Sequence, residues 1–134
     1  MKEAKVPRLL RIVSLAIATA LGGCGDEGPV PGLLTVSVTS PNAGDAAIVV
    51  VVSGPGPMTT AEAASPSNLV FSRPASSNML RAAVFGDVRS GPLLRFSVPD
   101  VGQAQAYAAS VLEVADITGA LRQSTSEYRV VVGR

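Results

Sequence analysis

The sequence predicts an all-β fold, an immunoglobulin-like β-sandwich of about seven strands. Three observations support this prediction. Short segments with apolar residues at every second position recur through residues 33–134, clusters of proline, glycine, asparagine and aspartate separate them, and no amphipathic segment exceeds one helical turn. The chain has 134 residues, 47% of them hydrophobic and 16% charged. This composition is too apolar for a disordered chain and too broken by glycine and proline for several membrane spans.

The first two strands are predicted from different patterns. Leu34, Val36 and Val38 alternate with hydroxyl side chains, which is typical of a strand with one buried face. Residues 41–45 (PNAGD) have the composition of a turn. Residues 46–52 are continuously apolar with a β-branched centre. We therefore expect a central strand that is covered on both faces.

The segment that follows is ambiguous. Thr59 and Glu62 have the spacing of a capping box, which could open one helical turn through Ala64, but Ser65-Pro66 would end it, and a short strand fits equally well. Residues 69–71 predict a brief strand, and residues 74–78 predict a turn.

Four further elements are expected in the second half. A strand over residues 79–85 places Arg81 on the face opposite Leu80, Ala82 and Val84. Residues 86–92 (GDVRSGP) predict a hairpin-like loop before a strand over residues 94–98. A strand within residues 105–114 is closed by a turn at 116–119, and a last strand covers residues 127–132. It would bury Tyr128, Val130 and Val132.

Part of this pattern is similar to a known family. Residues 91–98, 107–114 and 115–119 resemble the C-terminal strands of cohesin-type sandwiches. The similarity covers about a third of the chain and consists of strand spacing rather than a motif. It implies a cohesin-like sandwich but does not imply a dockerin-binding function.

The N-terminus predicts export. Residues 1–11 contain four basic side chains and one acidic one, and residues 12–21 (IVSLAIATAL) are uncharged, which is the pattern of a secretory signal peptide. As a helix this run would be about 15 Å long, half of the roughly 30 Å hydrocarbon core, so it does not predict a permanent transmembrane helix.

The residues after this run resemble the lipobox of bacterial lipoproteins, namely Leu21, Gly22, Gly23 and Cys24. The resemblance implies diacylglyceryl transfer to the Cys24 sulfur, cleavage after Gly23 and membrane attachment through lipid on Cys24, commonly with acylation of the new amino group. Gly25, where Asp would favour inner-membrane retention, implies the outer membrane. The alternative is an ordinary signal peptide cleaved near residues 18–20, with a free cysteine.

The expected organisation is therefore a signal peptide over residues 1–23, a lipidated flexible tether over 24–32 and a β-sandwich domain over 33–134. Residues 24–134 contain seven arginines, no lysine and nine acidic residues, a formal net charge of −2. The arginines are scattered, so nucleic acid is not an expected partner.

The same segment contains few groups for catalysis. Histidine is absent from the chain, which excludes His-based triads and Cys/His zinc sites, and no nucleophile motif surrounds a serine. We expect no enzyme, no catalytic or cofactor-binding residues and no cofactor. Asp45, Asp87, Asp100 and Asp116 each lie in an expected turn, where they could gather around calcium, but we predict turn formation and no metal site.

Two function classes remain open. The first is a small envelope lipoprotein whose non-catalytic sandwich binds an envelope protein or glycan, or is structural. The second is an accessory or substrate-delivery lipoprotein of an envelope hydrolase or glycan-binding system. Chain segments 86–92 and 54–66 are the expected contact surfaces. Five aromatic residues are available, most of them on predicted core faces: Phe71, Phe85, Phe96, Tyr107 and Tyr128.

Overall fold

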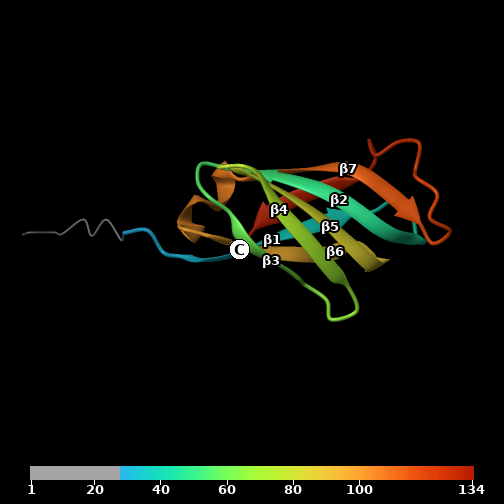
Figure 1. Cartoon of the computed structure of the whole chain (residues 1–134), viewed down its shortest axis with the longest axis horizontal. Helices are drawn as coiled ribbons and strands as arrows, with labels where there is room; N and C mark the ends of the chain where they lie inside the picture. The colour runs from blue at the N-terminus through green and yellow to red at the C-terminus, as the bar shows by residue number, and fades with distance from the viewer. Residues whose placement is uncertain (1–27) are drawn as a thin grey trace, which may run out of the picture.

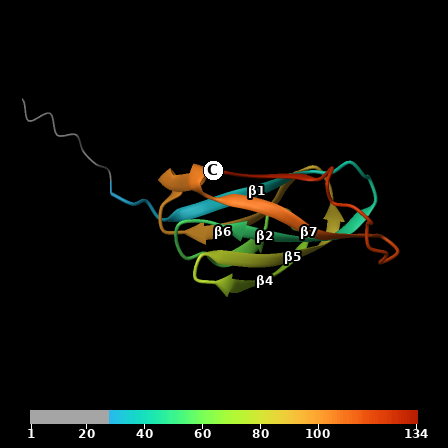
Figure 2. The ribbon, with the colours of Figure 1, turned by 90° about the horizontal axis from the view of Figure 1, so that it is seen from above.

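The computed structural model describes residues 28–134, which form two packed antiparallel sheets (Figures 1 and 2). One sheet has the order β3-β6-β1-β8 and the other β4-β5-β2-β7. The strands are β1 (Gly32–Thr39), β2 (Asp45–Ser53), β3 (Thr59–Ala63), β4 (Leu69–Ser76), β5 (Met79–Val88), β6 (Gly91–Val98), β7 (Ala108–Asp116) and β8 (Arg129–Gly133). The predicted all-β sandwich is confirmed, with eight strands rather than about seven.

The strand order is immunoglobulin-like in part. Strands β4-β5-β2 and β3-β6 have the neighbours of strands D-E-B and C-F in an immunoglobulin domain. The remaining pairs differ, because β7 lies beside β2 and β1 lies between β6 and β8. Only β4 and β5 are consecutive strands that pair with each other, and every other connection crosses between the sheets.

The core lies between the sheets and comes from alternate residues of each strand. In β1 the predicted set of Leu34, Val36 and Val38 is buried, and Phe96 of β6 is fully buried opposite Leu34. In β5, Leu80, Ala82 and Val84 are buried, as predicted. The sequence alternation therefore identifies the inner faces correctly.

Strand β2 has the predicted central position but not the predicted environment. It pairs with β5 on one side and β7 on the other. Ile48, Val50 and Val52 are buried, whereas Val49 and Val51 are only half-buried on the outside of the sheet. The expectation of cover on both faces is wrong, because only one layer packs against this sheet in the described part of the chain.

The ambiguous segment is a strand. β3 pairs with β6, and Thr60 has a φ of 43° at a register shift between Thr59 and Ala61. Strand β4 is longer than the predicted strand over residues 69–71. The predicted turn over residues 74–78 is too long, because Pro74 and Ser76 still pair with β5, at the sheet edge where proline is tolerated.

Residues 86–92 do not form the predicted hairpin. β5 continues to Val88 and β6 begins at Gly91, and these strands belong to different sheets. Gly86 has a φ of 138°, and a side chain there would meet Asn68, whose Oδ1 accepts a 2.8 Å hydrogen bond from the Asp87 amide. This glycine allows β5 to extend past its predicted end.

The start of the predicted 105–114 strand is instead the end of a short 3₁₀ helix, η1 (Val101–Ala106), after which β7 begins. Asp100 caps η1 by accepting a 2.9 Å hydrogen bond from the Gly102 amide, and it also accepts one from the Val30 amide. The Val101 amide donates to the Val30 carbonyl over 2.8 Å. These hydrogen bonds fix the chain to the rest of the domain from Val30 onward, two residues before β1 begins.

The last strand begins later than predicted. β8 starts at Arg129, and Tyr128 is buried just before it, while Val130 and Val132 are half-buried. Residues 117–128, which connect β7 to β8, lie at the end of the sandwich opposite to residues 28–31 (Figures 1 and 2).

Candidate functional site

The outer surface of the β4-β5-β2-β7 sheet is mainly apolar at the end farther from Val30. Register places two rows of side chains there: one runs from Leu69 through Phe85 to Ala47, the next from Phe71 through Ala83 to Val49. We call these six residues the apolar face. Leu69 is 65% exposed, Phe71 64% and Phe85 44%.

The outer surface of the other sheet is different. Its outward positions in β1 and β6 include Thr35, Ser37, Arg95 and Ser97, and Glu62 of β3 lies opposite Arg95. Hydroxyl groups and opposite charges at these positions are typical of a sheet surface in water. Leu33 and Val131 are exposed on this surface too, but each lies opposite a serine rather than beside another large apolar side chain on the paired strand. The contrast between the two surfaces makes the apolar face the candidate contact surface of the described residues.

Phe71 and Phe85 form an edge-to-face pair, with ring centroids 5.9 Å apart and planes inclined by 71°. Their strands are hydrogen-bonded neighbours, so the backbone fixes both rings on a regular sheet rather than on a loop. Asn68 strengthens this placement, because its amide binds Asp87 on the next strand through both oxygen and nitrogen.

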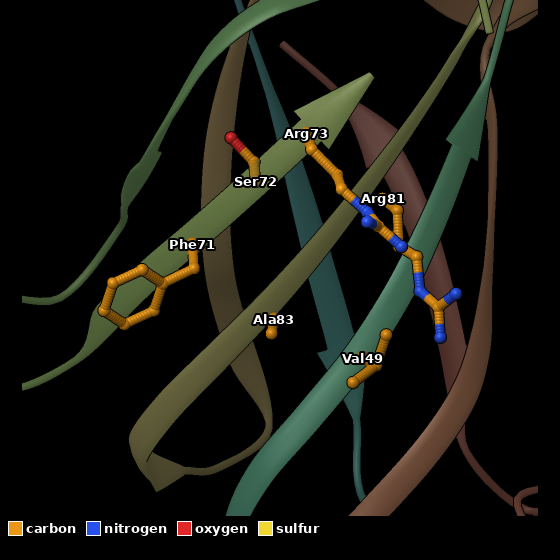
Figure 3. Close-up of a pocket in the computed structure, with 6 residues that line it drawn as sticks. All are labelled: Val49, Phe71, Ser72, Arg73, Arg81 and Ala83. Carbon is orange, nitrogen blue, oxygen red and sulfur yellow. The ribbon is translucent and has the colours of Figure 1, made fainter. Parts of the chain in front are cut away.

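Two arginines adjoin the apolar face. Arg73 and Arg81 are direct cross-strand partners in β4 and β5. They border a shallow hollow of about 330 Å³ that is also lined by Val49, Phe71, Ser72 and Ala83. In Figure 3 the Arg73 side chain extends from β4 across β5 toward Arg81, and the Arg81 side chain extends toward β2 and Val49. The ion pairs within residues 28–134 are Arg89–Asp87 and Arg122–Asp45, and neither includes these arginines.

The structure does not gather the four aspartates that were considered as calcium ligands. Asp45 and Asp116 are cross-strand partners in β2 and β7, but Asp100 lies beside Val30 at the other end of the domain. Asp87 pairs with Arg89, Asp100 caps η1, and Asp116 closes a turn by accepting bonds from the Thr118 hydroxyl and from the amides of Thr118 and Ala120. These bonds, first of all that of the Thr118 hydroxyl, lower the pKa of Asp116. Within residues 28–134 no three acidic, histidine or cysteine side chains are grouped as a metal site would need.

Asp45 is buried and belongs to a structural network. Its Oδ1 accepts bonds from Nε and a terminal nitrogen of Arg122 at 2.9 and 2.8 Å, and its Oδ2 accepts from the Tyr128 hydroxyl at 2.6 Å. The Asn42 amide donates to the same hydroxyl, and the Ser40 hydroxyl is 3.1 Å from Oδ2. Burial, followed by the bond to Asp45, raises the pKa of Tyr128. The polar atoms are satisfied by one another, which indicates a structural role.

The predicted contact segments are only partly loops. Residues 54–66 contain β3, and residues 86–92 consist mostly of the ends of β5 and β6. Of the five aromatic residues, Phe96, Tyr107 and Tyr128 are buried as expected, and Phe71 and Phe85 are the exposed exceptions. The lipobox residues Leu21, Gly22, Gly23 and Cys24 lie outside the described residues.

No helix within residues 28–134 is long and apolar enough to cross a membrane. Comparison with protein-family models, with curated proteins and with solved structures gives no match to this chain.

Proposed function

We propose that this protein is a lipid-anchored lipoprotein of the bacterial envelope, whose β-sandwich is a non-catalytic module that binds another protein through the apolar face. The observation on which this rests is the exposed Phe71–Phe85 pair within the apolar face. Exposed aromatic side chains on a rigid scaffold are typical of the energetic centre of a protein interface.

The anchor is proposed from the sequence. Cys24 follows an apolar run and two glycines, and Gly25 after it favours the outer membrane. Lipid chains would hold the protein at the bilayer, since each buried CH₂ contributes about 0.8 kcal/mol. Val30 is hydrogen-bonded to the end of the domain that lies opposite to residues 117–128. The apolar face lies toward the end that contains residues 117–128. The face would then be presented away from the anchor.

The non-catalytic assignment is supported by the character of the exposed groups. The hollow beside the apolar face contains two arginines and one serine but no carboxylate or other general base. Asp45, the most buried carboxylate of the described residues, is occupied by Arg122 and Tyr128.

The anchor is tested by the intact mass of the protein recovered from membranes, compared with a Cys24→Ala variant. We expect a chain that begins at Cys24 and has added acyl mass, and we expect both properties to be lost in the variant. An unmodified product cleaved elsewhere, for example near residues 18–20, would contradict the lipoprotein proposal.

The binding surface is tested by placing a photoreactive amino acid at Leu69 and crosslinking in cells. We expect a discrete protein product that disappears when Phe71→Ser and Phe85→Ser are added. The matched control is a probe at Val131, which is 64% exposed on the other sheet, as Leu69 is 65% exposed on this one. Equal products from both probes would contradict a specific binding face.

A further inference from the structure

We infer that the hollow beside the apolar face binds a carboxylate, and that the partner therefore presents an acidic side chain next to an apolar one. This inference rests on the proposed binding function and names the chemistry of the partner at the same site. It depends on Arg73 and Arg81, the two cationic side chains that line the hollow.

The two arginines have an arrangement that is unfavourable in the free protein. Like charges placed directly opposite each other on neighbouring antiparallel strands repel. Arg81 is half-buried, and neither arginine belongs to the ion pairs of the described residues. A carboxylate between the two guanidinium groups would accept charge-assisted hydrogen bonds from both and would remove their mutual repulsion.

The surroundings of the arginines define the second part of the ligand. Val49 and Ala83 line the hollow beside the arginines, and the exposed ring of Phe71 lies at its other border. An apolar side chain of the partner that covered these groups would exclude water. The effective dielectric constant near the guanidinium groups would then fall, and their attraction for the carboxylate would increase.

A second copy of this chain fits the hollow poorly. The carboxylate that a second copy would offer from this surface is that of Glu113 in β7. Glu113 lies opposite Val49, so β2 separates it from Arg81, whereas Arg73 and Arg81 lie directly opposite each other. Two such faces in contact would place four arginines in one interface. An anionic membrane surface is also disfavoured, since the apolar face lies toward the end of the domain opposite to Val30.

The test is the selection of binding peptides from a random library displayed on phage. The protein is used as cells produce it and is purified in detergent micelles. Three variants are compared with the parent: Arg73→Gln with Arg81→Gln, Phe71→Ser with Phe85→Ser, and Arg95→Gln. Arg95 is the matched control because it is a half-buried arginine in mid-strand on the outer surface of the other sheet.

We expect selected peptides to be enriched in aspartate or glutamate beside an apolar residue. Their affinity should fall about tenfold in the double arginine variant, weaken at high salt and stay unchanged in Arg95→Gln. Selected peptides that require Phe71 and Phe85 but contain no enrichment of acidic residues would overturn the inference and leave the binding function intact. Peptides that bind independently of both phenylalanines, or no selected peptides, would contradict both.

A second measurement distinguishes a lipid headgroup from a peptide. Phosphatidylglycerol is added to the micelles, and the amide signals of Arg73 and Arg81 are followed by nuclear magnetic resonance. We expect acidic peptides to shift these signals and the lipid to leave them in place. A shift caused by the lipid and absent with the peptides would overturn the inference and make an anionic lipid the occupant.

Discussion

The hydroxyl of Tyr128 donates a 2.6 Å hydrogen bond to Oδ2 of Asp45, joining the residue before β8 to the first residue of β2. Asp45 is 3% exposed, and its other oxygen accepts from Arg122, which lies in the connection between β7 and β8. A single buried carboxylate therefore fixes residues 117–128 to the opposite end of the sandwich from Val30.

Replacement of this carboxylate should destabilise the fold. In Asp45→Ala the buried Tyr128 hydroxyl loses its charged acceptor, and we expect the free energy of unfolding to fall by roughly 2 kcal/mol, measured by urea denaturation. Asp87→Ala is the matched control, because Asp87 is exposed and its partner Arg89 has a side chain that is 79% exposed. An equal loss in both variants would contradict the role assigned to the Asp45 network.

Alkaline conditions should also weaken the fold. Burial and the bond to Asp45 raise the pKa of Tyr128, and burial with the nearby charge of Asp100 raises that of Tyr107. Above about pH 10 the unfolded chain loses these protons first, so the stability that they contribute is present below that pH and declines as the pH rises through the folded pKa values. Unfolding free energies from pH 8 to 11 should fall for the parent, and less steeply for Tyr128→Phe.

Asp116 should contribute to the stability of the fold, and this contribution should be lost in acid rather than in alkali. Its bonds to Thr118 and Ala120 lower its pKa, so its contribution is present at neutral pH, above the unfolded value, and is lost as the pH falls through the folded value. The difference in unfolding free energy between the parent and Asp116→Asn should therefore shrink as the pH falls from 6 toward 2. A constant difference across this range would show that the carboxylate charge contributes nothing.

The sequence predicts the inner faces of the strands well because burial on one side of a sheet imposes a period of two. Leu34, Val36, Val38 and Phe96 illustrate this, since each is buried where the alternation places it. Chain connections are predicted poorly. Residues 86–92 have hairpin composition, yet a glycine at positive φ and a bond from Asn68, far away in sequence, allow β5 to continue.

The apolar face was not predictable from alternation alone. The unbroken apolar run of residues 46–52 predicts a strand that is covered on both faces. The outward residues Val49 and Val51 remain half-buried instead. Phe71 and Phe85 become a pair only through the register of β4 on β5, which the sequence does not specify.

Gly54 should be required for packing at the end of the domain that contains η1. A Cβ at this position would overlap the ring of Tyr107, and that ring packs against Phe96 with centroids 5.9 Å apart. Gly54→Ala should lower the free energy of unfolding by about 2 kcal/mol, since the buried ring must move. Gly56→Ala, where a Cβ would meet only Pro99 at 3.8 Å, should have little effect, and thermal denaturation of the two variants measures the difference.

The two kinds of phenylalanine provide a test of the assignment of faces. Phe96 is fully buried and Phe71 is 64% exposed, although both lie within strands. Phe96→Ala should lower the free energy of unfolding by roughly 4 kcal/mol through the cavity that it leaves, and Phe71→Ala by about 1 kcal/mol or less. If Phe96→Ala does not fold, Phe96→Leu should still lower the free energy of unfolding more than Phe71→Leu does. Similar costs at both positions would mean that Phe71 stabilises the isolated domain, and the case for a free binding face would then be lost.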